Sequence, residues 1–212
     1  MTGFKWLGNM ALSKVNEGKY PLLCYEEAIG FLLRDICYDK DGISAAGTFL
    51  EMYNFIQKNY SRSCTEQLSE IYNTYGYVAT VTSYFFCYDP KKMEKIFNRI
   101  RSLGPDGKFE YTCAQFPIRA IRDLTVGYDD NFPDKKPVLP VSASTQMLTF
   151  YFENGAQVTI RGSGTEPKLK YYADYSGGAT REETDNTLKA VIKAIVTEYL
   201  QPDLNDLPGP AD

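Results

Sequence analysis

The chain has 212 residues, enough for one domain or two small ones. It contains no histidine, which excludes catalysis by Ser-His-Asp or Cys-His groups and every zinc site that uses imidazole. Its 23 Lys and Arg against 27 Asp and Glu give a net charge of -4. That balance argues against a general nucleic-acid surface and leaves room for one local anion site.

The five cysteines predict free thiols rather than a disulfide framework or a zinc site. They are odd in number and widely spaced, and no two form a C-x-x-C pair, which suits a reducing compartment. The opening residues Met1 to Trp6 show no secretory signal, and no run approaches the roughly 20 apolar residues of a membrane helix. We therefore expect a cytoplasmic protein with no membrane partner and no nucleic-acid partner.

The first part of the chain predicts loops followed by two helices. Residues 1–30 are rich in glycine and aromatic residues and are expected to be loop-like. A helix is expected after Asp41, because apolar residues recur at helical spacing over 45–56. A capping box at residues 63–66 begins a second helix, and Gly76 stands where its C-terminal cap is expected.

The rest of the chain predicts a sheet with helices, because β-branched and aromatic runs alternate with amphipathic segments. Asn154-Gly155 is a strong hairpin signal between two such runs. The predicted elements are a strand over 77–88, a helix over 90–103, a strand over 116–123, a loop over 127–140, strands over 147–152, 156–161 and 169–175, and a helix over 181–199.

This order of elements predicts an α+β fold with an antiparallel sheet and helices on one face. The first part has too few strands to complete a layer of its own. We therefore expect residues 1–76 to be part of an α/β domain and 77–200 to be a complete α+β domain. Residues 201–212 are polar and contain proline, so they are expected to form a flexible tail.

The segment Arg-Gly-Ser-Gly-Thr-Glu-Pro-Lys at 161–168 carries the sharpest signal for a binding site. Its glycines favour a tight turn that points backbone N–H groups into one concavity, and its hydroxyl, guanidinium and ammonium groups are further donors. A phosphate dianion needs such donors. The alternative is a glycine-rich strand connection with solvated charges that binds nothing. The candidate phosphate-binding residues are Arg161, Gly162, Ser163, Gly164, Thr165, Lys168 and Lys170.

The same segment resembles the phosphate-binding loop of the α-D-phosphohexomutase superfamily, whose usual form is R-x-S-G-T-E-P-K. Three further motifs follow that family's order. Residues 1–6 resemble its Thr-Gly loop, 25–30 (Tyr-Glu-Glu-Ala-Ile-Gly) its sugar-binding loop, and 39–42 the Lys-Asp-Gly that opens the next helix. The similarity covers nearly the whole chain. The variant at 25–30, with residues 122–129, is most similar to the phosphopentomutase (phosphoglucomutase-2) and glucose-1,6-bisphosphate synthase branch.

The resemblance implies a domain assignment and roles for the candidate residues. Residues 1–76 would be the C-terminal part of the family's third domain, and 77–200 its fourth, TBP-like domain. The loop at 161–168 would hold the phosphate of the substrate that does not react. The sugar-binding residues that the resemblance implies are Thr2, Gly3, Glu26, Glu27 and Lys40.

Two motifs of the intact enzymes are absent from these 212 residues: the T-A-S-H-N-P-like phosphoserine motif and the D-G-D-x-D-R magnesium loop. Asp129, Asp130 and Asp134 lack the spacing of that loop. We therefore expect no catalytic residue and no metal ligand in this chain. Mg²⁺ and a sugar bisphosphate are expected as cofactors of the full-length enzyme only.

The resemblance implies that the chain is the C-terminal half of a phosphoglucomutase or phosphopentomutase. Such an enzyme interconverts sugar 1-phosphates and 6- or 5-phosphates through a phosphoserine and a bisphosphate intermediate. The expected partners are sugar phosphates of the glucose 1-phosphate and ribose 1-phosphate class and the missing N-terminal domains of the same enzyme. The isolated chain is then predicted to be inactive. The alternative function is a non-catalytic module that binds sugar phosphates.

Overall fold

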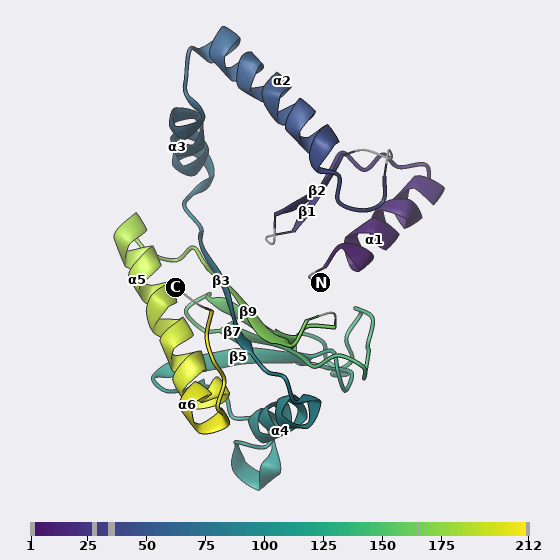
Figure 1. The fold of residues 1–212 in the computed structure, drawn as a ribbon. Coiled ribbons are helices and arrows are strands. Elements are labelled where there is room, and N and C mark those ends of the chain that lie inside the picture. Colours follow the sequence, from purple (N-terminus) through teal and green to yellow (C-terminus); the bar gives the residue numbers. More distant parts are fainter. Residues whose placement is uncertain (1–2, 27–28, 34–36, 165, 211–212) are drawn as a thin grey trace. The chain divides into compact units, whose positions relative to one another are not determined.

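The structure, a computed structural model, describes residues 3–26, 29–33, 37–164 and 166–210 (Figure 1). The chain divides into two compact units, Met1–Tyr75 and Gly76–Asp212. Each unit has its own cluster of buried apolar residues, a small one in the first and a large one in the second.

The described part of the first unit combines helices with one short hairpin. The predicted capping box is confirmed, because Ser63 and Glu66 bond reciprocally. The helix expected after Asp41 begins at Gly42, and the Asp41 carboxylate caps it by accepting the backbone N–H of Ile43. β1 and β2 pair in the antiparallel sense. The elements are α1 (Phe4–Asn16), β1 (Leu23–Glu26), β2 (Gly30–Leu33), α2 (Gly42–Tyr60) and α3 (Cys64–Tyr75).

The expectation of loops over residues 1–30 is wrong, because α1 occupies Phe4–Asn16. Phe4 and Ala11 of this helix are buried together with Leu32 of β2. Gly8, which suggests a loop in the sequence, is required by packing: a Cβ there would lie 2.0 Å from the carbonyl oxygen of Tyr38. A close approach of two backbones therefore explains this glycine within a helix.

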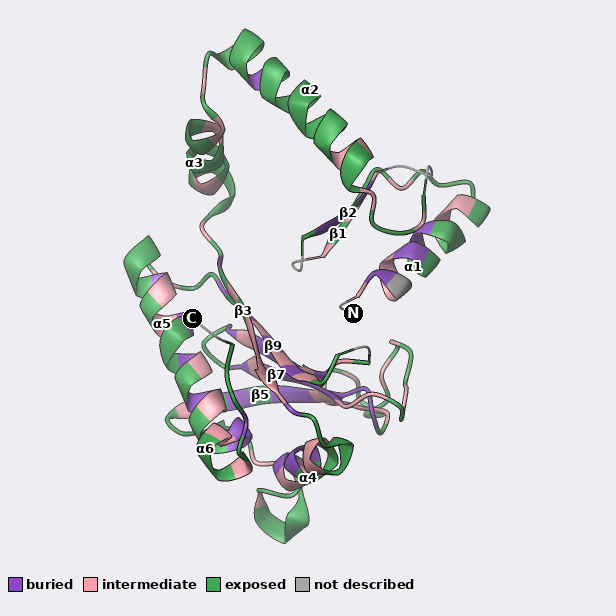
Figure 2. Ribbon diagram, in the orientation of Figure 1, coloured by how far each residue is buried: buried purple, intermediate pink, exposed green. Residues whose placement is uncertain are grey.

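Helices α2 and α3 leave most of their apolar side chains exposed (Figure 2). Ile56 is the buried residue of α2, and α3 buries none. Phe49, Leu50 and Phe55 of α2 are between 53% and 60% exposed. A helix of a globular protein normally buries its apolar stripe, so the described residues do not supply the surface that these helices would pack against.

The second unit is built on an antiparallel sheet with the strand order β3-β9-β8-β7-β5-β4, and β6 pairs with β5. The predicted hairpin turn at Asn154-Gly155 joins β7 and β8. The elements are β3 (Ala79–Phe86), α4 (Pro90–Arg101), η1 (Pro105–Gly107), β4 (Thr112–Cys113), β5 (Phe116–Asp123), β6 (Tyr128–Asp129), β7 (Met147–Phe152), β8 (Gln157–Gly162), β9 (Lys168–Tyr175), α5 (Arg181–Ala194), the π-helical η2 (Ile195–Leu200) and α6 (Pro202–Asn205).

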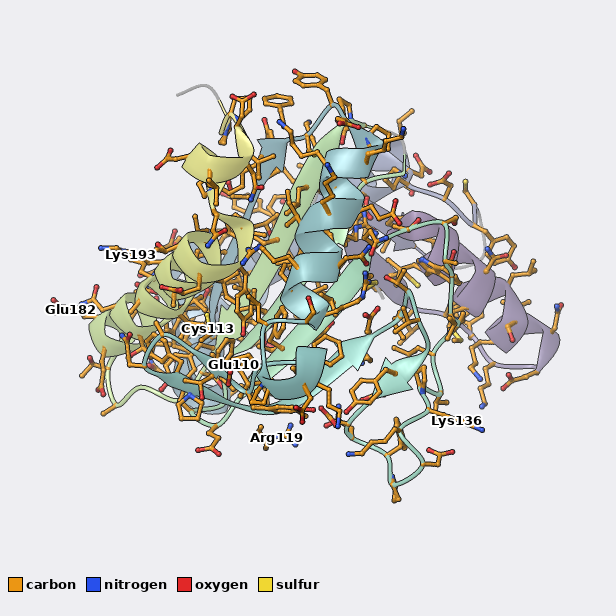
Figure 3. The ribbon with its side chains drawn as sticks, turned by 90° about the horizontal axis from the view of Figure 1, so that it is seen from below. Glu110, Cys113, Arg119, Lys136, Glu182 and Lys193 are labelled. Atoms are coloured by element: carbon orange, nitrogen blue, oxygen red, sulfur yellow. The ribbon has the colours of Figure 1, made fainter. Side chains whose placement is uncertain are left out.

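Side-chain alternation gives this sheet two different faces. Phe150 of β7 and Ile160 of β8 point into the core, where they join Phe97 of α4 and Leu188 of α5. The predicted α+β architecture, with helices on one face, is therefore confirmed. Figure 3 shows Glu182 and Lys193 of α5 directed outward, and both are exposed. The opposite face, here called the polar face, carries Thr149, Thr159, Arg161, Lys170 and Tyr172.

The segment 202–208 packs against the rest of the second unit, whereas the sequence predicts a flexible tail over 201–212. It forms α6, and Leu207 is only 5% exposed within the main core. The backbone N–H of Phe86, on the edge strand β3, donates to the carbonyl of Pro208 at 2.8 Å. The buried side chain of Leu207, this hydrogen bond to the edge strand and the contacts of Lys92 Nζ with Asp206 therefore hold the segment in place.

We predict that Leu207→Ala lowers the free energy of unfolding by about 2–3 kcal/mol, because it leaves a cavity in the core. Leu204→Ala is the matched control, since Leu204 is 79% exposed, and its effect should stay within about 0.5 kcal/mol. Urea denaturation of the full chain, followed by circular dichroism, measures both. Equal effects of the two substitutions would show that the segment is not docked.

Candidate functional site

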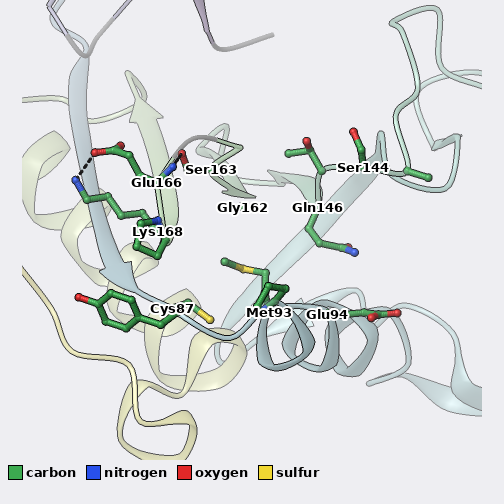
Figure 4. Close-up of a pocket in the computed structure, with 14 residues that line it drawn as sticks. Cys87, Met93, Glu94, Ser144, Gln146, Gly162, Ser163, Glu166 and Lys168 are labelled. Carbon is green, nitrogen blue, oxygen red and sulfur yellow. Dashed lines mark hydrogen bonds and ion pairs between the residues drawn. The ribbon is translucent and has the colours of Figure 1, made fainter.

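The candidate phosphate loop connects β8 to β9, and the backbone fixes its base (Figure 4). The N–H of Ser163 donates to the carbonyl of Lys168 at 2.8 Å, which closes the loop. The N–H of Gly162 donates to the carbonyl of Gln146 at 3.0 Å, and the N–H of Cys87 donates to that of Pro167 at 2.8 Å. The segments that precede β7 and follow β3 therefore hold the two sides of the loop.

The two loop glycines do not adopt the left-handed backbone conformation that favours glycine. Neither Gly162 nor Gly164 has a positive φ angle. Gly162 instead lies against the side chain of Met93, whose nearest atoms would be 3.7 Å from an added Cβ. Two of the loop's N–H groups, those of Ser163 and Glu166, already donate to Lys168 O and Ser163 Oγ.

The cationic side chains of the loop gather on the polar face. Strand pairing places Arg161 directly across from Lys170 and Lys170 across from Tyr84. Glu166 contacts both lysines, with Lys168 Nζ 2.8 Å from its Oε1 and Lys170 Nζ 3.0 Å from its Oε2. The Lys168 ammonium also lies 4.3 Å from the centroid of the Tyr84 ring. The arrangement is a compact cluster of cations with one carboxylate in its midst.

These contacts shift the pKa values of Glu166 and Lys168. Hydrogen bonds from Lys168 and Lys170 lower the pKa of the Glu166 carboxyl to about 2. The hydrogen bond to Glu166 raises the pKa of the Lys168 ammonium in turn. Glu166 and Lys168 are therefore both charged at neutral pH.

A buried carboxylate supports the base of the loop from behind. Asp123 is fully buried, and its Oδ2 accepts Nε of Arg101 at 2.6 Å. Nη2 of Arg101 donates to the side-chain oxygen of Gln146 at 2.7 Å, and the carbonyl of Gln146 accepts the N–H of Gly162. The other Asp123 oxygen accepts the N–H of Thr125 at 2.8 Å. Gln146 is thus held through both its side chain and its backbone.

A cavity of about 440 Å³ opens beside the loop within the second unit (Figure 4). Its volume falls within the range typical of small-molecule sites. Ser163 and Lys168 of the loop line one part of it, and Cys87, Met93 and Gln146 line other parts. The sequence did not point to these last residues, because no spacing rule connects positions so far apart in the chain.

The candidate sugar-binding residues that can be described, Gly3, Glu26 and Lys40, lie in the first unit, and Glu26 and Lys40 lie near each other around Gly30. Gly3 is the N-cap of α1, and Glu26 ends β1 opposite Gly30. The side chain of Lys40 crosses over Gly30, where an added Cβ would lie 2.6 Å from it. Its ammonium lies 5.0 Å from the centroid of the Phe4 ring, and Glu26 is among the groups that raise its pKa, after Asp39. Thr2, Glu27 and Thr165 lie outside the described residues.

The acidic residues at 129–134 are occupied by partners within the protein. The Asp130 carboxylate accepts the phenols of Tyr111 and Tyr128 and the ammonium of Lys135. Across the described ranges, no three or more His, Cys, Asp or Glu are placed to hold a metal ion. These residues do not fit the Mg²⁺ that the family resemblance implies for the intact enzyme.

The family model for phosphoglucomutase/phosphomannomutase, alpha/beta/alpha domain III, matches residues 1–75. The chain is 45% identical to phosphopentomutase of Pongo abelii, covering all of this chain and 35% of that protein. It is 43% identical to glucose 1,6-bisphosphate synthase of Mus musculus, over 98% of this chain and 34% of that protein. The chain belongs to the α-D-phosphohexomutase superfamily.

A solved structure has a similar fold. Parafusin, a phosphoglucomutase of Paramecium, matches 97% of this chain and 33% of its own with a TM-score of 0.53 and 21% identity. The probable phosphoribomutase of Schizosaccharomyces pombe is 40% identical over 99% of this chain. The chain spans about a third of the length of the curated relatives it matches and corresponds to the C-terminal portion of the superfamily.

None of the described helices of this chain combines the length and apolar character needed to cross a membrane.

We predict that the double variant Lys168→Met, Lys170→Met raises the pKa of Glu166 from about 2 toward its usual value of 4.5, because the carboxylate loses both hydrogen-bond donors. A pH titration of the carboxyl carbon by NMR measures this. Lys95→Met removes an exposed ammonium from α4 and is the control that should leave the midpoint unchanged. An unchanged midpoint in the double variant would contradict the observed pairing.

Proposed function

We propose that this chain supplies the sugar-binding and distal-phosphate-binding parts of a phosphomutase. The intact enzyme would interconvert sugar 1-phosphates and 5- or 6-phosphates through a phosphoserine and a bisphosphate intermediate. The observation that carries the proposal is that one short loop brings Arg161, Lys168 and Lys170 together and borders a cavity, which Lys168 lines. The relatives, by their names phosphopentomutases, phosphoribomutases and glucose 1,6-bisphosphate synthases, support a sugar phosphate as the ligand.

The proposed domain assignment gives residues 1–76 to the C-terminal part of the third phosphohexomutase domain and 77–200 to the fourth. The match of residues 1–75 to the domain III model supports the first assignment. The apolar side of α2, which includes the exposed Phe49 and Met52, supports it physically, because a helix with such a side normally packs against a sheet or another helix. The rest of the third domain, in the N-terminal part of the enzyme, would supply that surface.

The proposed roles follow from the chemistry of each cluster. Arg161 offers a planar fork that can hold two phosphate oxygens, and Ser163 adds a hydroxyl donor. In the first unit, Glu26 would accept sugar hydroxyls while Lys40 and the backbone at Gly3 orient the sugar or its phosphate. Thr2, Glu27, Gly162, Gly164 and Thr165 are proposed to complete the two sites by their place in the motifs.

The chain would position a substrate without performing the transfer. Phosphoryl transfer needs an aligned nucleophile and electrostatic stabilisation of the transferring group. The serine and magnesium loops that would supply these are not among the 212 residues. Mg²⁺, where bound in the intact enzyme, would neutralise charge on the transferring phosphoryl group. The present residues would bind and orient the sugar and grip the other phosphate.

We predict that ribose 5-phosphate and glucose 1-phosphate bind the full chain saturably and that Arg161→Ala weakens binding about tenfold or more, because it removes a charge-assisted contact. Titration calorimetry measures this. Arg119→Ala is the matched control, since Arg119 is an exposed arginine on β5 outside the loop. Flat titrations, or equal affinity in all three proteins, would refute the proposed site.

We predict that the pure chain forms no glucose 6-phosphate from glucose 1-phosphate, even with Mg²⁺ and glucose 1,6-bisphosphate, since it lacks the phosphoserine motif. A coupled assay for glucose 6-phosphate checks this against a protein-free blank. Turnover above the blank that disappears in Arg161→Ala would show that the chain is itself a mutase. Binding without turnover would also be expected of the alternative, a non-catalytic module that binds sugar phosphates. The size of the endogenous protein distinguishes the two functions, because only a phosphomutase would carry the N-terminal domains.

A further inference from the structure

The lysines of the phosphate loop are already paired with an anion that belongs to the protein. Glu166 uses one carboxylate oxygen for Lys168, at 2.8 Å, and the other for Lys170, at 3.0 Å. The side chains of both lysines are only about 20% exposed. A carboxylate that bridges two ammonium groups in this way occupies the position that a bound phosphate would take on them.

The charges of these three groups lead in the same direction. Lys168 and Lys170 bring two positive charges, and Glu166 lowers the net charge of the three groups to +1. A phosphate dianion that replaces the carboxylate on the two lysines therefore gains more Coulomb attraction than a singly charged ligand would.

Glu166 is not needed to place the lysines. Lys168 lies directly across the β3–β9 ladder from Phe86, and its ammonium is 4.3 Å from the Tyr84 ring centroid and 5.7 Å from that of Phe86. Lys170 sits within β9, whose backbone is bonded on both sides. Glu166 itself is 42% exposed, so its carboxylate can turn into water at small cost.

We propose that Glu166 is an internal competitor for Lys168 and Lys170, which a phosphate dianion displaces when it binds the loop. The competitor limits affinity and favours dianions over singly charged ligands, since a single negative charge gains little by replacing another. This inference rests on the proposed function of the loop. In the proposed mutase, either phosphate of a bisphosphate must leave the loop for the sugar to reorient, and the carboxylate would assist that release.

The decisive variant is Glu166→Gln in the full chain, with inorganic phosphate as the probe. It should bind phosphate about 5- to 20-fold more tightly than the wild type at low salt, and added NaCl should reduce the gain because the charges are partly exposed. Glu153→Gln is the matched control: it makes the same change of net charge in the exposed turn between β7 and β8. Glu153→Gln should bind phosphate like the wild type.

The outcomes separate this inference from the function on which it rests. Phosphate binding that needs Arg161 but is unchanged or weakened in Glu166→Gln would overturn the inference alone, because Glu166 would then be neutral or would position the lysines. Absence of binding in both wild type and Glu166→Gln would overturn the proposed function and the inference with it. Binding by Glu166→Gln only would support the inference.

A measurement on the unaltered chain guards against misfolding of the variant. Saturating phosphate should shift the carboxyl carbon resonance of Glu166 at neutral pH, because both ammonium partners leave it for the ligand. The resonance of Glu153 should not move. A Glu166 resonance that stays in place while phosphate saturates the loop would show that the lysines remain with the carboxylate, against the proposal.

Discussion

The antiparallel pairing of β8 with β9 is the constraint on which the candidate phosphate site depends. It places Arg161 directly across from Lys170 and Gly162 across from Leu169. The N–H of Ser163, bonded to the carbonyl of Lys168, closes the loop just beyond the last ladder pair. Because these bonds are made by the backbone, the distance between the loop's cations follows from the strand register. The register therefore sets the relative positions of Arg161 and Lys170 at the base of the loop.

The same register places the residues that stabilise the fold and the residues of the candidate site on opposite faces of the sheet. Ile160 and Leu169 point into the core, while their neighbours Arg161 and Lys170 point to the polar face. A slip of one residue would exchange the two faces and bury the charges. Core packing thus supports the strands that carry the cationic side chains. The buried Asp123, acting through Arg101 and Gln146, adds a polar support that the apolar core alone does not provide.

Local signals in the sequence were sufficient for many elements. The cap at Asp41, the capping box at residues 63–66 and the hairpin at Asn154-Gly155 each depend on groups a few residues apart. The failures involve distant groups. Gly8 belongs to a helix because the backbone at Tyr38 approaches it, and the segment around Leu207 is ordered because that side chain reaches a core built from other elements.

The sequence by itself determined which chemical groups the candidate site contains and which superfamily the chain resembles. Arg161, Lys168 and Glu166 stand in one short motif, and motifs are local in the chain. Only the tertiary structure decided how these groups are used. The bridging of Lys168 and Lys170 by Glu166, and the support of the loop by Gln146, depend on strand register and on contacts between segments far apart in sequence. No periodicity or spacing encodes such distances, because they exist only once the sheet has formed.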